Sequence, residues 1–342
     1  MTLSGRIRLA VVGCGYITQA EHVPALLTAL PRVEVVAMID PDGARAEAVA
    51  APFGAKAFVS FDDALSAGGF DAVLIATPAK THVALIARAA QAGKHILVEK
   101  PIAYSLSEAR EAIRIVAESG VTCMVAYQRR YDDDCRRVKT LLAEGAVGEV
   151  RAAVSQCRLT FPSVYAGYAP VVKAASDASH ETGQDFRADW LIENSIHHLN
   201  LMRFWLGPVT DVHAAVYREQ DHDLGIVTLS FGAVLASHHQ LRGMECGEEI
   251  SLYGSRGALH VSLWYPHRPY AFPRIVLFNR EASTRREVIL SRASPYTNEL
   301  MAFLDHLRGE AGNVSTLEDS LEDLLVLKRI KDIATYTAQA QG

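Results

Sequence analysis

The chain has 342 residues, 49% of them hydrophobic, and a formal net charge of -5 at pH 7. This length allows two domains with substantial cores, and the small charge without a basic stripe argues against binding to nucleic acid or to a membrane surface. No stretch approaches the roughly 18 apolar residues of a membrane span or resembles a signal peptide, and the 5 cysteines lack paired metal-type spacing. We therefore expect a cytoplasmic protein with reduced thiols and no bound metal.

The first predicted element is a buried strand at 9–12, which leads into a glycine-containing turn and then a helical pattern of apolar residues. Gly13 permits the tight turn, Gly15 lets the backbone approach a pyrophosphate, and the free N–H groups of the helix start favour its negative charge. Thr18 stands where a third glycine or an alanine is usual, so the motif is imperfect. The turn predicts a dinucleotide site.

A second predicted strand, at 32–39, ends in Asp40. Its carboxylate comes at the place in the chain where the ribose hydroxyls of a dinucleotide need an acceptor. Because Asp40 would repel a 2′-phosphate, NAD(H) is preferred over NADP(H). Arg45, just beyond it, keeps NADP(H) possible as the cofactor.

Strands and helices continue to alternate up to about residue 126. Further strands are predicted at 57–59, 71–76, 95–98 and 121–126, and helices at 44–51, 61–65, 82–92 and 105–118. Such alternation predicts a parallel sheet covered by helices on both faces, with ligands at the carboxyl ends of the strands. Five candidate residues follow predicted strands, so all of these should lie along one edge: Gly13, Asp40, Thr77, Lys100 and Gln128.

The pattern changes beyond residue 131. A helix is predicted at 132–144, a strand at 150–159, a long loop over the active site at 161–185 and a helix at 190–206. Strands then follow without intervening helices, which indicates an antiparallel sheet, and two helices close the chain. These strands lie at 210–216, 225–230, 233–239, 249–253, 258–262 and 274–278, and the helices at 296–307 and 317–337. We expect one domain over 1–128 and a second over 129–342.

Two features supply chemistry beside the predicted dinucleotide site. Lys100 ends a strand next to the expected nicotinamide position, and Glu193 and His197 share one helix face. Removing hydride from a carbinol carbon requires a base for the hydroxyl proton, and histidine titrates near neutrality. A lysine ammonium would stabilise the developing alkoxide, and the carboxylate could orient the imidazole or bind a neighbouring hydroxyl.

With these residues in view, the chain resembles the glucose–fructose oxidoreductase, inositol dehydrogenase and rhizopine-catabolism oxidoreductases (Gfo/Idh/MocA) over nearly its whole length. Glu-Lys-Pro combined with Ala-Thr-Pro-x-x-x-His is far more specific than the glycines. The resemblance implies an α/β Rossmann domain with a parallel sheet, followed by an α+β domain with a large open antiparallel sheet. It rests on the turn at 13–17, Ala76-Thr77-Pro78 with His82, Glu99-Lys100-Pro101, the segment 128–131, the turn at 145–150 and the histidine helix.

The resemblance also implies roles for individual residues. Lys100 and His197 would be the catalytic pair, with Glu193 beside them, and the Lys100–Pro101 peptide would be cis. The outer face of the open sheet would form a homodimer or homotetramer. The cofactor would contact Gly13, Gly15, Tyr16, Ile17, Asp40, Thr77, Pro78, His82, Glu99, Lys100 and Gln128.

The chain departs from the family on the substrate side. Where the family's helix reads Asp-x-Gly-x-His-x-x-Asp, this chain has Glu193, Ser195 and Asn200, and residues 187–190 replace a glycine-rich lead-in. Packing of the loop and a structural salt bridge of Arg130 remain open as alternatives to substrate contact. The residues expected to contact the substrate are Arg130, Tyr168, Arg187, Trp190 and Asn194.

These features predict an NAD-dependent oxidoreductase that transfers hydride between nicotinamide and a secondary hydroxyl or ketone of a sugar, cyclitol or sugar derivative. One alternative is an enzyme that uses bound NAD transiently in a redox-assisted glycoside cleavage or elimination. Another is a non-catalytic NAD-binding sensor. Net NADH production separates the first interpretation from both alternatives.

Overall fold

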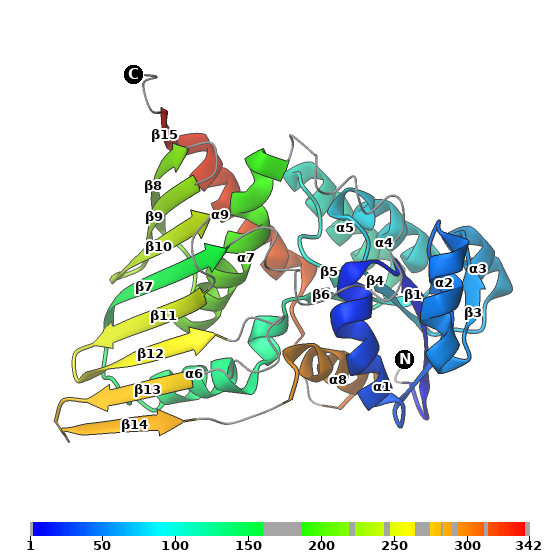
Figure 1. Cartoon of the computed structure of the whole chain (residues 1–342), viewed down its shortest axis with the longest axis horizontal. Coiled ribbons are helices and arrows are strands. Elements are labelled where there is room, and N and C mark those ends of the chain that lie inside the picture. The colour runs from blue at the N-terminus through cyan, green and yellow to red at the C-terminus, as the bar shows by residue number, and fades with distance from the viewer. Residues whose placement is uncertain are drawn as a thin grey trace. The chain divides into compact units, whose positions relative to one another are not determined.

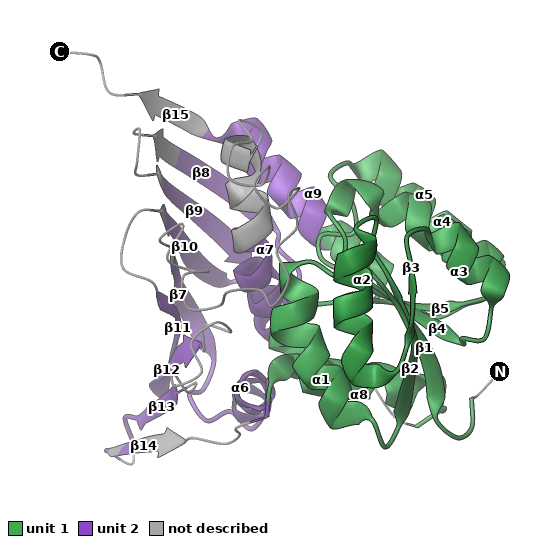
Figure 2. Ribbon diagram, turned by 45° about the vertical axis from the view of Figure 1, so that its right-hand side comes forward, with its two compact units in different colours: residues 1–131, 170–187, 294–322 green, residues 132–169, 188–293, 323–342 purple. Residues whose placement is uncertain are grey.

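A computed structural model describes residues 3–159, 186–218, 223–242, 247–263, 274–281, 283–288, 293–310 and 314–338 (Figure 1). Side chains of residues 186–194 lie outside this description. The chain divides into two compact units (Figure 2). Apart from the gaps, unit 1 contains residues 3–131, 186–187 and 294–322, and unit 2 contains 132–159, 188–293 and 323–338. The expected boundary after residue 128 lies close to the first of these divisions and stays a prediction.

Unit 1 is built on a six-stranded parallel sheet in the order β3-β2-β1-β4-β5-β6. Its middle strands are apolar without alternation, because helices bury both faces. The strand order reverses between β1 and β4, which is where open α/β sheets bind ligands. The strands are β1 (Ile7–Val12), β2 (Val33–Ile39), β3 (Lys56–Phe58), β4 (Ala72–Ile75), β5 (His95–Glu99) and β6 (Cys123–Ala126).

Helices cover both faces of this sheet (Figures 1 and 2). On one face α1 packs against α8, a helix from the far end of the chain, and Leu26 and Phe303 are fully buried in their shared core. On the other face α4 packs against α5. The helices are α1 (Val23–Ala29), preceded by a π-helical turn (Thr18–His22), α2 (Gly43–Ala50), α3 (Phe61–Ala67), α4 (His82–Gln91), α5 (Leu106–Ser119) and α8 (Pro295–Leu307). Short 3-10 turns occur at Ala51–Phe53, Ala79–Thr81 and Gln128–Tyr131.

Unit 2 contains a nine-stranded sheet in the order β14-β13-β12-β11-β7-β10-β9-β8-β15. Its neighbours are antiparallel except for β7 with β10 and β8 with β15, which are parallel, so the predicted large antiparallel sheet is confirmed. The strands are β7 (Val150–Leu159), β8 (Asp211–Arg218), β9 (Asp223–Phe231), β10 (Val234–Arg242), β11 (Gly247–Gly254), β12 (Gly257–Leu263), β13 (Arg274–Asn279), β14 (Thr284–Val288) and β15 (Thr335–Ala338).

Side chains alternate along these strands between a buried and an exposed face, as half-buried strands require. On β10, for example, Ala236 and His238 are buried whereas Leu235 is 57% exposed. The long helix α7 (Phe186–Leu206) is hydrogen-bonded to the buried face of the sheet through Ser195 and His198. The other helices are α6 (Asp133–Ala143) and α9 (Leu317–Ile333), the latter running from unit 1 into unit 2.

The structure corrects one predicted element and adds a strand. The last helix was expected to reach residue 337, but α9 ends at Ile333, and Thr335–Ala338 pairs in parallel with β8. Threonine and tyrosine favour a strand where a sheet edge is available, which explains this ending. Strand β14 was not predicted. The expected loop at 161–185 lies outside the described residues.

Among the helices that the structure describes, none combines the length and the apolar character of a membrane span.

Candidate active site

The predicted cofactor residues lie along one edge of the unit 1 sheet. Gly13 and Asp40 directly follow β1 and β2, and Lys100 directly follows β5. Thr77 and Gln128 come just after β4 and β6. Because all six strands are parallel, their carboxyl ends form a single edge, and the switch between β1 and β4 lies within it.

The turn after β1 requires glycine for two reasons. Gly13 has φ +93°, and a Cβ added there would come within 2.8 Å of the Ala76 carbonyl carbon and 2.9 Å of Thr77 Cγ2. Around Gly15, in contrast, an added Cβ would meet no atom within 4 Å. The Thr18 hydroxyl donates a hydrogen bond to the Gly13 carbonyl oxygen at 2.6 Å, so the departure at the third motif position ties the helix start to the turn.

Asp40 is buried beside this turn. Its Oδ2 accepts a hydrogen bond from the Cys14 N–H at 2.9 Å, and its Oδ1 accepts from the Asp42 N–H at 2.9 Å and from the Arg45 guanidinium at 2.8 Å. A carboxylate can accept about four hydrogen bonds, so capacity remains for a ribose hydroxyl. Burial and the Asp40 charge raise the pKa of the Cys14 thiol to about 12, which keeps it protonated.

Glu99 is anchored beneath the loop that carries Lys100. Its Oε1 lies 2.9 Å from His22 Nε2, and its Oε2 accepts a hydrogen bond from the Lys100 N–H at 3.2 Å. Burial opposes ionisation, but the hydrogen bond and charge of His22 and the charge of Lys100 outweigh it, so the pKa of Glu99 is lowered. The Lys100–Pro101 peptide is cis, as predicted. His22 was not predicted; its only signal is a histidine in the helix that follows the glycines.

His82 joins the loops after β4 and β5. It is fully buried, and its Nε2 and Nδ1 lie 2.8 Å from the Thr77 carbonyl oxygen and 2.9 Å from the Pro101 carbonyl oxygen. Burial lowers the pKa of His82, although the two carbonyl contacts act in the opposite direction. A neutral imidazole has one N–H and donates it to one of these carbonyl oxygens, and the buried ring contacts both loops.

Two candidates near the end of β6 are engaged within unit 1. Gln128 is buried and donates a hydrogen bond from Nε2 to the Tyr296 hydroxyl at 3.4 Å. Arg130 forms an ion pair with Asp319 at 2.6 Å, which favours the salt-bridge alternative for this residue. Both contacts connect the carboxyl end of β6 to residues 294–322, which return to unit 1 after most of the second sheet.

Helix α7 carries the remaining candidates. His197 is half-buried and belongs to unit 2, whereas Lys100 belongs to unit 1, so their approach stays a prediction. The helix includes four candidates whose side chains are not described, and Tyr168 lies outside the described residues. These four are Arg187, Trp190, Glu193 and Asn194.

Two departures from the family helix have clear partners in the structure. Ser195, which replaces a glycine, donates a hydrogen bond to Gln240 Oε1 at 3.2 Å and lies 3.0 Å from His238 Nε2. Asn200, which replaces an aspartate, donates from Nδ2 to Asp323 Oδ2 at 2.6 Å, and Arg203 binds the other oxygen. Because Asp323 already supplies a buried carboxylate, an amide suits position 200 better than a second acid.

Comparison with known proteins agrees with this architecture. Residues 7–127 match the model of the oxidoreductase family with an NAD-binding Rossmann fold, and residues 135–260 match the GFO/IDH/MocA C-terminal domain. The chain therefore belongs to the Gfo/Idh/MocA oxidoreductase family. The predicted family and the NAD-binding Rossmann domain are confirmed.

Similar proteins act on cyclitols and sugar derivatives. The chain is 31% identical over 281 residues to scyllo-inositol 2-dehydrogenase (NAD(+)) of Bacillus subtilis (strain 168), covering 75% of this chain and 77% of the relative. It is 29% identical over 289 residues to dTDP-3,4-didehydro-2,6-dideoxy-alpha-D-glucose 3-reductase of Streptomyces antibioticus, covering 82% of each. A crystal structure of a 3-ketoreductase from Actinomadura kijaniata with NADP and TDP-benzene has the same fold, with TM-score 0.79, 22% identity and coverage of 98% of this chain and 100% of that one.

Proposed function

We propose that the chain is an NAD-dependent oxidoreductase that transfers hydride between nicotinamide and a secondary hydroxyl or ketone of a sugar, cyclitol or sugar derivative. The observation that carries this proposal is the sheet edge of unit 1, where the glycine turn, Asp40 and Lys100 follow neighbouring parallel strands. Family membership and the two relatives that act on a cyclitol and a deoxysugar support the substrate class.

The residues of this edge fit a dinucleotide. Open space around Gly15 leaves room for a pyrophosphate against the backbone, and Asp40 retains an acceptor site for a ribose hydroxyl. The Asp40–Arg45 ion pair offsets the charge that Arg45 would offer to a 2′-phosphate, which supports NAD over NADP. Tyr16, Ile17, Thr77 and Pro78 would line the same site.

Buried residues would position the cofactor loops. His82 lies between the Thr77 and Pro101 carbonyl oxygens, within hydrogen-bond distance of each, and Glu99 accepts a hydrogen bond from the Lys100 backbone. Gln128 supports the end of β6 from beneath. Because these three side chains are buried, we assign them to shaping the site more than to direct contact with the nucleotide.

Lys100 and His197 would carry the acid–base chemistry. NAD, when bound, supplies hydride acceptance or donation at its nicotinamide ring. In the oxidation direction, His197 takes the hydroxyl proton while the Lys100 ammonium stabilises the developing negative charge on that oxygen. Glu193 would orient His197 or accept a hydrogen bond from a neighbouring substrate hydroxyl. Tyr168, Arg187, Trp190 and Asn194 are proposed as substrate contacts. Arg130, held by Asp319, is proposed to border the site.

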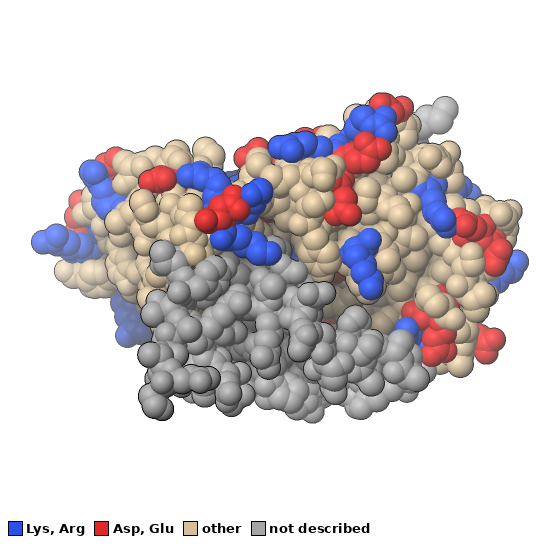
Figure 3. Space-filling model, turned by 90° about the horizontal axis from the view of Figure 1, so that it is seen from above, with Lys and Arg blue, Asp and Glu red and all other residues tan. Residues whose placement is uncertain are grey.

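The exposed face of the unit 2 sheet supports association with further copies of the chain. Large apolar side chains stand exposed on four of its strands: Ile226, Leu235, Tyr253 and Phe278. Monomeric proteins rarely leave such side chains together on one face, so we propose a homodimer or homotetramer. On the face shown in Figure 3, acidic and basic side chains are interspersed. We further propose a small-molecule substrate and a cytoplasmic location.

The proposal is tested by incubating the protein with NAD and a panel of sugars and cyclitols while following nicotinamide absorbance. We expect steady NADH production by the wild type and a loss of turnover of about 10²–10⁴-fold in Lys100→Ala, with NAD affinity little changed. Lys80→Ala is the matched control, because Lys80 is an exposed lysine beside the same sheet edge. Product formation without net NADH would favour transient redox chemistry, and NAD binding without any turnover would favour a sensor.

A further inference from the structure

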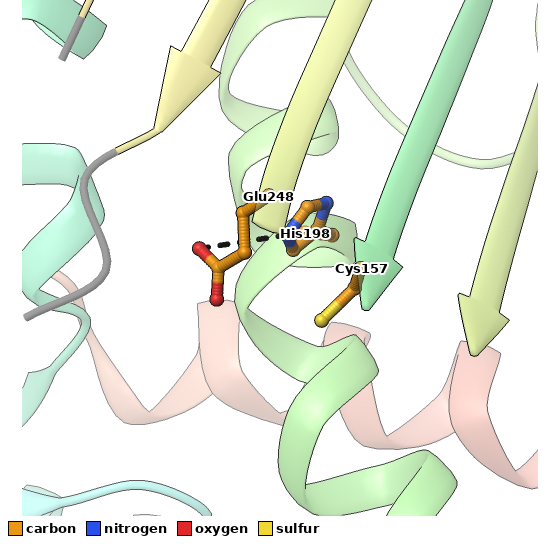
Figure 4. Close-up of side chains that lie close together, drawn as sticks. All are labelled: Cys157, His198 and Glu248. Atoms are coloured by element: carbon orange, nitrogen blue, oxygen red, sulfur yellow. Dashed lines mark ion pairs between the residues drawn. The ribbon is translucent and has the colours of Figure 1, made fainter. Parts of the chain in front are cut away.

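A buried polar cluster in unit 2 is not used by the proposed function. Cys157 on β7 and Glu248 on β11 are direct partners across the two strands, and His198 points at both of them from α7 (Figure 4). Their residues are 1%, 8% and 1% exposed, respectively, so all three groups face the interior between the helix and the sheet. The inner face of the sheet therefore brings a thiol, an imidazole and a carboxylate together.

The geometry of these groups matches that of metal ligands. His198 Nε2 lies 3.7 Å from Glu248 Oε2, and one ligand atom from each of the three residues lies within 4.8 Å of the others. Bonds of about 2.0–2.3 Å to a tetrahedral Zn²⁺ place neighbouring ligand atoms about 3.3–3.8 Å apart. The three ligand atoms would therefore need to move only slightly closer together to coordinate a Zn²⁺ ion.

His198 Nε2 has no hydrogen-bond partner among the described residues although its side chain is almost fully buried. Buried polar atoms of this kind are rare in native proteins and call for an explanation. The other ring nitrogen, Nδ1, is engaged by the Ser155 hydroxyl at 2.7 Å. The ring is thus fixed on one side and open toward Cys157 and Glu248 on the other.

A chain of hydrogen bonds determines which nitrogen of His198 carries its proton. Ser195 donates its hydroxyl hydrogen to Gln240, so His238 Nε2 must be the donor in its contact with Ser195. With its proton on Nε2, the neutral His238 ring accepts a hydrogen bond at Nδ1 from the Ser155 hydroxyl, 2.9 Å away. The Ser155 oxygen must then accept from His198 Nδ1–H, which leaves a lone pair on His198 Nε2.

We propose that Cys157, His198 and Glu248 bind a Zn²⁺ ion between α7 and the sheet. Thiolate and imidazole ligands select zinc over magnesium or calcium, and a carboxylate is a common third ligand. The Cys157 thiol releases its proton to solvent on binding, so thiolate and carboxylate together balance the charge of the ion. Ser155 is the outer hydrogen-bond partner that orients a metal-bound histidine. Water completes the tetrahedron.

The ion would connect α7 to β7 and β11, and so would hold the helix that carries His197. The sequence predicted no metal because the three ligands are separated by long stretches of chain and lack a spacing motif. The site lies within unit 2 and does not depend on the proposed hydride transfer.

The test is a titration of the chelator-treated, reduced full-length protein with Co²⁺, followed by displacement with Zn²⁺. We expect one Co²⁺ per chain, a thiolate-to-cobalt charge-transfer band and its loss when Zn²⁺ is added. Zn²⁺ should also raise the midpoint of thermal unfolding. Absence of the charge-transfer band in the wild type would overturn the proposal without any need for a variant.

Matched variants locate the site. Cys157→Ser should abolish the band and His198→Gln should weaken Co²⁺ binding at least tenfold, with loss of the Zn²⁺-induced thermal shift. Cys135→Ser and His239→Gln are the controls, since Cys135 is another buried thiol of unit 2 and His239 lies on the opposite face of β10 from His238. A band that persists in Cys157→Ser, or that disappears equally in the controls, would contradict the assignment.

Discussion

Asn200→Asp tests the physical reason for an amide in the histidine helix. In the wild type, Asn200 Nδ2 donates to Asp323 Oδ2 at 2.6 Å, and the two residues are 1% and 0% exposed. The substitution removes a hydrogen bond to a charged group and brings two buried carboxyls together. Only one of them can ionise easily, although Arg203 remains bound to Asp323. We expect a loss of about 3 kcal/mol in the free energy of unfolding at pH 7, similar to breaking a buried ion pair.

The pH dependence of this loss follows from the shared proton. The pair raises one carboxyl pKa in the folded state, so the folded variant binds more protons than the unfolded chain, and its stability falls as pH rises above about 4. Urea unfolding between pH 4 and pH 8 should show a destabilisation that is small at acid pH and grows toward neutrality. Asn279→Asp, at a half-buried position of the same unit, should show little of this growth. A pH-independent difference, or wild-type stability throughout, would refute the reasoning.

Three further predictions concern unit 1. Gly13→Ala should destabilise the fold by about 2–4 kcal/mol and abolish NAD binding measured by calorimetry, because a Cβ at positive φ would collide with Ala76. Unchanged affinity would remove the glycine turn from the cofactor site. Burial and the Glu99 charge raise the pKa of Glu299 well above its ordinary value, so its contribution to stability is lost as pH rises above about 4.5. Glu299→Gln should therefore be more stable than the wild type at pH 8 and equal to it near pH 4 in urea unfolding, and the reverse trend would contradict this. Cys14, with its raised pKa and buried thiol, should be alkylated by iodoacetamide only after unfolding, as judged by mass spectrometry; rapid labelling in the native protein would disprove it.

Local sequence patterns predicted unit 1 well because they record burial directly. Strands covered on both faces are continuously apolar, and each ends in a turn residue at the same sheet edge, so Gly13, Asp40 and Lys100 could be placed without coordinates. Thr18 fits the third position of the glycine motif because its hydroxyl donates a hydrogen bond to the Gly13 carbonyl oxygen. Motif spacing alone could not predict this hydrogen bond.

Contacts between distant segments were the part that sequence could not predict. Helix α8 was expected as a helix, but its packing against α1 depends on tertiary structure. The same holds for the pairing of β15 with β8 and for the contact between His22 and Glu99. Apolar periodicity indicates which face of an element is buried and says nothing about its partner.

The most direct test of hydride transfer uses a cyclitol or sugar deuterated at the oxidised carbon, with mass spectrometry of the nicotinamide after turnover. The proposed chemistry predicts deuterium retained in the reduced cofactor, at a rate greatly decreased in Lys100→Ala and His197→Ala. Deuterium returned to the sugar product, or absent from the cofactor while the substrate is consumed, would contradict the proposed dehydrogenase.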